Sequence, residues 1–155
     1  MSRSRRYLWT TPILLILATW ESHAQTAEVL NPDVRQGTID QTICTSGYTK
    51  DVRPATSYTN GVKAKLMREQ GIDWSRAREY ELDHIIPLEA GGHPRNIHNL
   101  QLQLWDGADG AHAKDKLEHR LHRMICHRQI TLSEAQACIW NDWHACATKY
   151  AKARR

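Results

Sequence analysis

Residues 80–86 read YELDHII and residues 99–104 read NLQLQL. Apolar and polar side chains alternate in both stretches, which is typical of half-buried β-strands. Pro87 ends the first stretch, and Gly91 and Gly92 lie in the loop that joins the two. The pattern therefore predicts an antiparallel β-hairpin.

Helical patterns lie on both sides of this hairpin. A helix-compatible segment at residues 57–70 is followed by Gly71, which occupies the position of a C-terminal cap. After a turn at residues 106–110, two apolar stripes with helical spacing follow, separated by a capping box at residues 131–134. The stripes consist of Leu117, Leu121, Met124 and Ile125, and of Ile139, Trp143, Cys146 and Tyr150. We expect the last two helices to form an antiparallel pair over the sheet of an α+β domain.

The N-terminus has the order of a secretory signal. An arginine-rich run precedes an apolar stretch at residues 7–20, and residues 22–24 offer small side chains at the two cleavage positions. We expect a signal peptide at residues 1–24, a periplasmic or secreted protein, and no membrane attachment after cleavage. A membrane anchor is the alternative, although the apolar stretch is shorter than the ~20 residues of a spanning helix.

After cleavage about 130 residues remain, enough for one modest core. We expect one monomeric unit with an arm and a helix at residues 25–78, a central part at 79–127, and a C-terminal helix with a basic tail at 128–155. The arm has little periodicity, and we expect it to be extended, with turns and one short strand near Ile43. Removing 3 of 21 basic and 1 of 17 acidic residues leaves a net charge of +2, which by itself does not indicate a nucleic-acid partner.

Four cysteines lie in the mature part: Cys44, Cys126, Cys138 and Cys146. An even number of cysteines in an exported chain predicts disulfides, and the lack of a CxxC pair excludes the usual zinc site. Cys138 and Cys146 lie in one expected helix, where they would be about 12 Å apart, so they can pair only if that helix breaks. The preferred bridge is Cys44 with Cys126, and four buried thiols are the alternative.

Asp83, His84 and Asn99 form the combination with the clearest chemistry. Cutting a phosphodiester needs a base for water and a cation for the developing charge. His84 can take a proton at neutral pH, and Asp83 offers the hard oxygen that Mg²⁺ prefers. Asn99 would accept a hydrogen bond from His84 and orient it. Adjacent strand residues face opposite sides, so Asp83 and His84 share a cleft only if the strand ends there. The alternative is a core histidine beside a surface carboxylate.

The combination resembles the HNH endonuclease family. The shared pattern is Asp83-His84, an apolar pair, Pro87-Leu88, a Gly-Gly turn and then Asn99-Leu100. Further residues as far as Asp142-Trp143 are similar to a group of exported bacterial HNH-like proteins. The resemblance implies a ββα-metal core with flanking helices and an extended N-terminal arm, in which the hairpin lies against a helix and one divalent cation is bound.

The resemblance also implies roles for single residues. His84 would be the general base, Asn99 its orienting residue and Asp83 a metal ligand. The family's further ligand position, at the start of the helix, falls on Ala108, which has no ligand atom. A longer turn would place His112 there, with two acidic residues of the helix, Asp115 and Glu118, as competitors. The implied cofactor is Mg²⁺ in the first place, with Mn²⁺, Zn²⁺ or Ni²⁺ as alternatives.

The same helix carries basic residues for a nucleic-acid partner. One stripe has spacings of four, three, four and four and contains His112, Lys116, His119, Arg123 and His127. Such a stripe can lie along phosphates, or it can be only a solvated face. Lys114 and Arg120 are further candidates for neutralising phosphate charge. The expected nucleic-acid contacts are therefore Lys114, Lys116, Arg120 and Arg123.

The sequence thus predicts an exported, metal-dependent endonuclease that acts on DNA, with RNA as the alternative. Little sequence specificity is expected, because the chain has no appended recognition module. Two other classes remain as alternatives: a catalytically silent nucleic-acid-binding domain, and a disulfide-stabilised envelope protein that uses the motif only as a scaffold.

Overall fold

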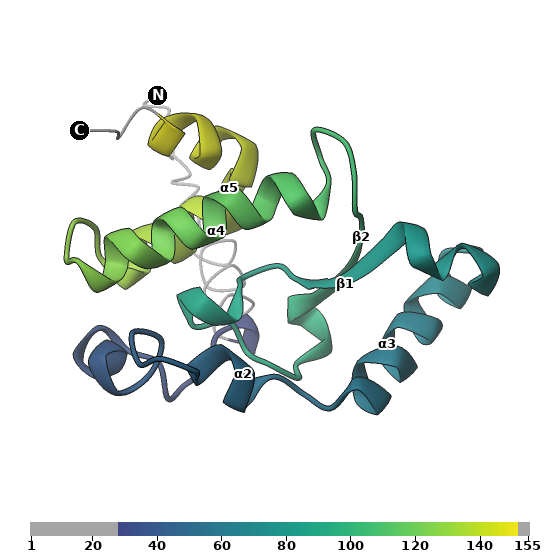
Figure 1. Ribbon diagram of the computed structural model, residues 1–155, viewed down its shortest axis with the longest axis horizontal. Coiled ribbons are helices and arrows are strands. Elements are labelled where there is room, and N and C mark those ends of the chain that lie inside the picture. The colour runs from purple at the N-terminus through teal and green to yellow at the C-terminus, as the bar shows by residue number, and fades with distance from the viewer. Residues whose placement is uncertain (1–27, 152–155) are drawn as a thin grey trace, which may run out of the picture.

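A computed structural model describes residues 28–151, which combine helices with one two-stranded antiparallel sheet (Figure 1). The expected signal peptide and the last four residues of the basic tail lie outside the described residues. Strand β1 is Tyr80–His84 and strand β2 is Leu100–Leu104, with Tyr80 opposite Leu104 and His84 opposite Leu100. The predicted α+β class and the hairpin are confirmed, and β1 ends two residues before the alternating pattern does.

The chain has three longer helices in its described part: α3 (Thr56–Glu69), α4 (Ala111–Cys126) and α5 (Leu132–Ala151). Gly71 follows α3 with a φ of 68°, as expected for a capping glycine. The capping box before α5 is also present, because Thr131 Oγ1 accepts from Glu134 N at 3.1 Å and Glu134 Oε2 accepts from Thr131 N at 2.7 Å. Short 3₁₀ helices make up the loops: η1 (Gln36–Gln41), η2 (Trp74–Glu79), η3 (Leu88–Ala90) and η4 (Ile97–Asn99).

The N-terminal arm differs from the expectation. It contains η1 and α2 (Tyr48–Val52), and the strand predicted near Ile43 does not form. Thr42 Oγ1 donates to the carbonyl of Thr38 at 2.7 Å, and Thr45 Oγ1 donates to that of Asp40 at 2.8 Å. Such local side-chain bonds offer the backbone an alternative to strand pairing. The arm is therefore a series of tight turns that buries Ile43 in the core.

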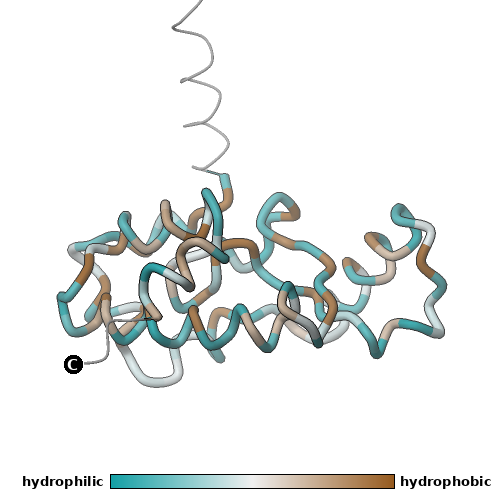
Figure 2. Tube along the Cα trace, turned by 90° about the horizontal axis from the view of Figure 1, so that it is seen from above, coloured by the Kyte–Doolittle hydropathy of each residue, from teal (hydrophilic) through white to brown (hydrophobic). Residues whose placement is uncertain are grey.

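The hydrophobic core lies between this arm and the helix pair α4–α5, at the end of β1 rather than beneath the sheet (Figure 1). Hydrophobic and hydrophilic residues alternate along the packed segments, as amphipathic elements require (Figure 2). The buried side chains come from the arm (Val29, Ile39, Ile43), from α4 (Leu117, Leu121, Ile125) and from α5 (Ala135, Ile139, Cys146). The helix pair therefore covers the arm and η3, and α3, rather than this pair, packs along both strands.

Helix α5 breaks at Asp142, whose φ of −168° and ψ of 100° are not helical. Asp142 Oδ1 accepts from the backbone N–H groups of His144 and Ala145 at 2.9 and 3.0 Å, so it caps a new helical segment. The break brings the Cα atoms of Cys138 and Cys146 to 5.4 Å, and the two form a disulfide. The expectation of one unbroken helix that keeps these cysteines apart is wrong, because it overlooked this cap.

The expected Cys44–Cys126 disulfide is present, with its Cα atoms 5.6 Å apart. It ties the arm to the C-terminal end of α4. Two disulfides in a small domain are typical of an oxidising, extracytoplasmic environment. Among the described residues, no helix has the length and apolar character needed to cross a membrane.

The two disulfides should contribute unequally to stability. The Cys44–Cys126 bridge spans a sequence separation of 82, against 8 for Cys138–Cys146. Loop-closure entropy gives about 4.5 kcal/mol for the longer loop and about 2.5 kcal/mol for the shorter one. We expect Cys44→Ala/Cys126→Ala to lose ~2 kcal/mol more free energy of unfolding than Cys138→Ala/Cys146→Ala, measured by urea unfolding. Equal losses would contradict an origin in loop entropy.

Candidate functional site

Asp83 and His84 line the same cavity, of about 160 Å³, at the point where β1 ends. Both side chains are buried, with 8% and 5% of their surface exposed. The regular alternation stops after His84, which allows neighbouring residues to share one cavity. The strand thus ends where it must end for Asp83 and His84 to share one cleft. The rest of the lining is strongly polar and includes Thr49, Arg53, Glu81, Glu89, Asp115, Glu118 and His119.

His84 has one ring nitrogen fixed by the backbone. Its Nε2 lies 3.2 Å from the carbonyl oxygen of Pro94, which can only accept, so Nε2 carries the hydrogen. The lone pair is then on Nδ1, the nitrogen that can take a proton. Burial lowers the pKa of His84, and the Pro94 carbonyl and Asp83 oppose this effect only in part. The imidazole is therefore neutral at neutral pH, in a tautomer suited to a base.

Asn99 has a different role from the expected one. Its side chain accepts from Ile86 N at 2.8 Å and donates to Ile86 O at 3.0 Å and to His93 O at 3.1 Å. It therefore clamps the loop that follows β1 and makes no hydrogen bond to the His84 ring. Gly92 is part of the clamp, because a Cβ there would lie 1.8 Å from Ile86 O. Asn99 positions His84 only indirectly, through the backbone.

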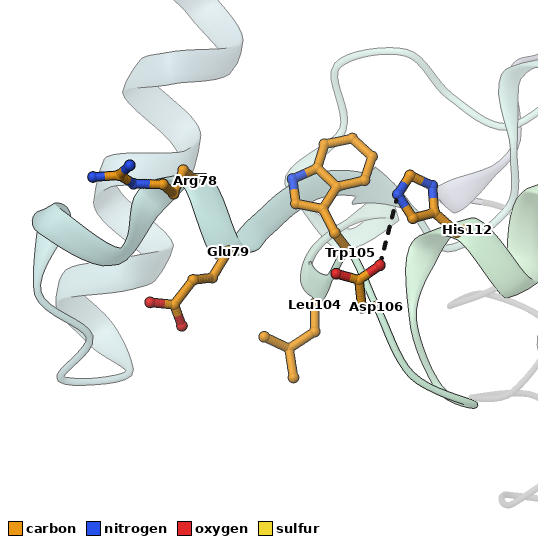
Figure 3. A pocket seen from close by; sticks show the side chains of 6 residues that line it. All are labelled: Arg78, Glu79, Leu104, Trp105, Asp106 and His112. Carbon is orange, nitrogen blue, oxygen red and sulfur yellow. Dashed lines mark ion pairs between the residues drawn. The ribbon is translucent and has the colours of Figure 1, made fainter.

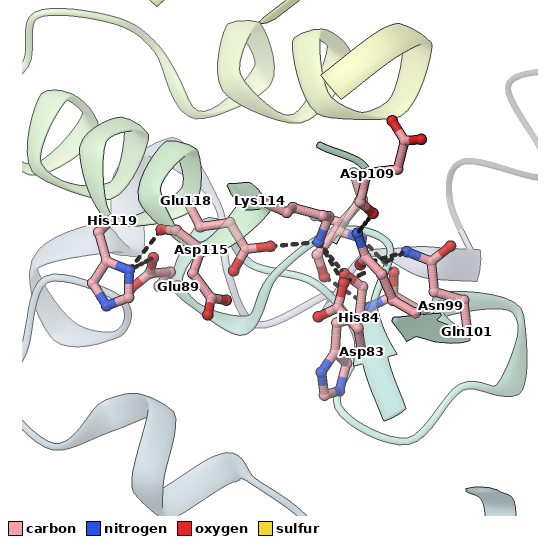
Figure 4. Close-up of polar contacts among 12 residues, drawn as sticks. Asp83, His84, Glu89, Asn99, Gln101, Asp109, Lys114, Asp115, Glu118 and His119 are labelled. Carbon is pink, nitrogen blue, oxygen red and sulfur yellow. Dashed lines mark hydrogen bonds and ion pairs between the residues drawn. The ribbon is translucent and has the colours of Figure 1, made fainter. Parts of the chain in front are cut away.

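Lys114 of α4 is buried at the centre of the site (Figure 4). Its Nζ donates to Asp83 Oδ2 at 2.8 Å, to His84 O at 2.7 Å and to Glu118 Oε1. Burial alone would lower the pKa of Lys114, but the charges of Glu118 and Asp83 outweigh it and raise the pKa. With 1% of its surface exposed, Lys114 does not reach a nucleic acid in this structure. The expected phosphate contact is corrected to an internal ion pair.

The surrounding carboxylates carry more negative charge than Lys114 compensates. Burial raises the pKa of Glu118 to about 7, against the attraction of Lys114. Burial and the charge of Asp83 raise the pKa of Glu81 to about 7, and burial raises that of Glu89. Glu81 Oε2 and Glu89 Oε1 are buried without a hydrogen-bond partner. A cation bound in the cavity would relieve orphaned carboxylate oxygens of this kind.

His112 does not join Asp83 in the described structure. It lines a separate cavity with Arg78, Glu79, Leu104, Trp105 and Asp106 (Figure 3). Its ring centroid lies 5.2 Å from that of Trp105, and its Nε2 lies 4.0 Å from Asp106 Oδ1. His112 is the second residue of α4 and lies near the start of β1, whereas Lys114 and Glu118, farther along the helix, face the end of β1. Glu118 and Asp115, the expected competitors, are the helix residues that line the Asp83 cavity.

Lys116, Arg120 and Arg123 of α4 lie outside the cavity, whereas His119 lines it. Lys116 and Arg123 are exposed, as are the other members of the basic stripe, His112, His119 and His127. Arg120 is half-buried and donates to Tyr150 O at 2.9 Å, which ties α4 to the end of α5. Lys116 and Arg123 thus remain available to a partner, and Arg120 has a structural contact.

Sequence reasoning missed the residues that reach the cavity from outside the hairpin and α4. Thr49 and Arg53 come from α2 and the residue after it, in an arm where no pattern indicated function. Glu89 lies in η3, with Oε1 3.8 Å from His119 Nδ1 and Oε2 3.9 Å from His122 Nδ1. The only available signal for Glu89 was its position in the loop between Pro87 and the glycines.

A divalent cation fits the chemistry of this cavity. Side chains of described residues bond to Asp83 only at Oδ2 and to Glu118 only at Oε1. The other oxygen of each carboxylate is therefore available to a cation. No three of the cavity's carboxylates and imidazoles among the described residues bring ligand atoms within 4.8 Å of one another. The cavity therefore offers one or two hard oxygens at a time, which suits Mg²⁺, an ion that keeps several waters and binds substrate phosphate.

Another cluster, Cys44, His122 and Cys126, does bring its ligand atoms within 4.8 Å. The two sulfurs are joined in a disulfide, so neither is the thiolate that a metal requires. The carboxylate-lined cavity is the better candidate for a metal.

Comparisons with protein-family models, with curated proteins and with solved structures find no match. The resemblance to HNH proteins therefore depends on the residues and their arrangement.

Replacing Lys114 by methionine should destabilise the fold strongly. Asp83 and Glu118 would then be buried carboxylates without their counter-ion, which costs about 3–5 kcal/mol of unfolding free energy. Because the pKa of Glu118 is about 7, its carboxyl is protonated in acid and needs no counter-ion there. We expect the loss, measured by urea unfolding, to be larger at about pH 9 than at about pH 5.

Lys116→Met is the matched control, because Lys116 is exposed on the same helix. It should change the free energy of unfolding by less than about 0.5 kcal/mol. A second variant, Lys114→Met/Glu118→Leu, removes one of the two stranded carboxylates and should recover part of the loss. A loss for Lys114→Met that does not depend on pH would contradict the ion-pair explanation.

Proposed function

We propose that this protein hydrolyses phosphodiester bonds in nucleic acid, as an exported HNH-like endonuclease with little sequence specificity. The observation that supports this most is the state of His84, which is neutral, held through Nε2 by Pro94 and placed in a polar cavity. A base of this kind can remove a proton from water, the first requirement of the reaction. The order β1, β2, α4 also agrees with the ββα-metal core that the resemblance to HNH proteins implies.

The proposed step uses the two ends of the imidazole differently. A water molecule gives its proton to His84 Nδ1 while its oxygen attacks phosphorus in line with the departing 3′ oxygen. The imidazolium that forms keeps its Nε2–H bond to the Pro94 carbonyl and is attracted by the neighbouring Asp83 carboxylate. Asn99 and Gly92 keep the loop after β1 in the conformation that this arrangement needs.

One divalent cation, Mg²⁺ in the first place, is part of the proposal. Asp83 and Glu118, each through the oxygen not bonded to Lys114, are the residues that would hold it. When bound, it would stabilise the negative charge on the leaving oxygen. Lys114 keeps Asp83 and Glu118 at fixed positions beside His84. The proposed substrate is DNA, with RNA as the alternative, and exposed Lys116 and Arg123 are proposed to contact its phosphates.

A second candidate function is nucleic-acid binding without catalysis. The ammonium of Lys114 already neutralises one oxygen of Asp83, and the ligand position at Ala108 has no donor atom. Both features weaken the cation site but leave a binding surface intact. The two candidates differ in one measurable property, the turnover of a phosphodiester.

Purified protein with both disulfides formed should nick supercoiled plasmid in the presence of Mg²⁺ or Mn²⁺, and EDTA should abolish the nicking. His84→Ala should lower the nicking rate by about 10²-fold or more, because the base is lost. His98→Ala is the matched control, since the His98 side chain is 62% exposed on η4, outside the cavity. The control should nick at the rate of the unchanged protein.

The outcomes separate the candidates. Plasmid binding without nicking by the unchanged protein would favour the silent binding domain. Neither nicking nor binding would contradict both and would favour a structural role in the envelope. Equal nicking by His84→Ala and His98→Ala would overturn the assignment of the base.

A further inference from the structure

Three neighbouring cavities follow β1 from its end to its start. The His84 cavity shares Arg53, Glu81 and Leu82 with a second cavity of about 190 Å³. That second cavity shares Trp105 with the large open cavity of about 710 Å³ that contains His112. Because consecutive cavities share wall residues, the three form one row along β1. We call it the β1 groove, and it is about as long as the five-residue strand, roughly 16 Å.

Basic side chains occur in each part of the β1 groove. Arg53 lines its first two cavities, Lys63 the second and Arg78 the third. Arg53 and Arg78 are exposed and form no ion pair with any residue in the described part of the chain. Unpaired guanidinium groups along a groove are suited to phosphates, which they bind through two parallel hydrogen bonds.

The acidic groups in the groove are partly compensated. Glu79 pairs with Arg76 at 2.6 Å, and Asp106 lies 4.0 Å from His112. In the second and third cavities Arg53, Lys63 and Arg78 therefore outnumber the two carboxylates that pair with no lysine or arginine, Glu81 and Asp106. The His84 cavity keeps its excess of carboxylates.

Trp105 separates the second cavity from the third and borders both. Its indole is partly exposed, and His112 lies at one side with ring centroids 5.2 Å apart (Figure 3). Such a ring can stack on a nucleobase that is turned out of its own strand. In a duplex the bases are stacked and paired, so only an unpaired nucleotide can present its face to this ring.

We propose that the β1 groove binds a single strand of nucleic acid, with Arg53 against a phosphate beside His84 and Trp105 against a base. The inference deepens the proposed function by naming the form in which the nucleic acid is held, as one strand with an unpaired nucleotide, and the location of the scissile bond depends on that function. Binding in the groove does not depend on catalysis, so the two can be tested separately.

The test is fluorescence anisotropy with labelled twelve-nucleotide oligothymidylate, the matching oligouridylate and a hairpin duplex, all in EDTA so that no cleavage occurs. Single strands should bind more tightly than the duplex, and the two single-strand arms show whether deoxyribose or ribose is preferred. Trp105→Leu should weaken single-strand binding by roughly ten-fold, the value of one stacked base. Arg53→Ala should weaken binding and lower its salt slope by about one.

Matched controls exist for both variants. Trp74 is 51% exposed on η2 and lies outside the β1 groove, and Arg68 is an exposed, unpaired arginine in the last turn of α3. Trp74→Leu and Arg68→Ala should bind within two-fold of the unchanged protein. Trp105→Tyr keeps an aromatic face and should retain most of the affinity, which separates stacking from a folding defect.

Three results would overturn the inference: tighter binding of the duplex, equal affinities of the groove variants and their controls, or no binding at all. If groove variants lose single-strand binding and the protein nicks nothing, the inference holds and the proposed function fails. If the protein nicks plasmid and the groove variants bind like their controls, the proposed function holds and the inference fails.

Discussion

The ammonium of Lys114 has three protons and three oxygen acceptors, contributed by Asp83, the backbone of His84 and Glu118. Two of these belong to the end of β1 and the third to the next turn of α4. A buried ammonium that lost one acceptor would leave a charged proton or a carboxylate uncompensated, at a cost of several kcal/mol. The position of α4 against the hairpin is therefore defined by hydrogen-bond directions, whereas apolar packing alone would tolerate small shifts.

The same ion pair determines the electrostatics of the cavity. Lys114 brings one positive charge to a region with four carboxyls, those of Asp83, Glu118, Glu89 and Glu81. Burial raises the pKa of the last three above the usual value of a glutamate. Protonation is one way to reduce this excess and a bound cation is another. A structural lysine and a weak cation site are thus compatible, because the lysine fixes two carboxylates and leaves one oxygen of each uncommitted.

Features encoded by neighbouring residues were predictable from the sequence. The alternating stretches gave β1 and β2, Gly71 marked the end of α3, and Thr131 with Glu134 marked the start of α5. The Cys44–Cys126 bridge and the shared cavity of Asp83 and His84 also agree with expectation. Apart from the bridge, which joins residues with a sequence separation of 82, these features depend on periodicity, caps or a strand end, each of which a short window of sequence contains.

The features that were not predictable depend on contacts between distant residues. A lysine beside the apolar stripe of α4 has the pattern of an exposed residue, and its burial depends on Asp83, 31 positions earlier. Asn99 was expected at the His84 ring, but the loop conformation directs it to Ile86. Asp142 was a local signal that was overlooked, since an aspartate inside an expected helix can cap a new segment.

The N-terminal arm shows how these distant contacts bear on the site. Its own sequence has no catalytic pattern, yet it supplies Arg53 to the edge of the His84 cavity. The described part of the arm consists of turns and short helices. It is fixed on α4 by the Cys44–Cys126 bridge and by the burial of Ile39 and Ile43. A guanidinium at the end of a mobile segment would bind phosphate only after paying the entropy of ordering. The bridge and the core order the arm beforehand, so the charge of Arg53 is held where β1 ends. It lies there in the same cavity as His84, whose ring is fixed by the carbonyl of Pro94.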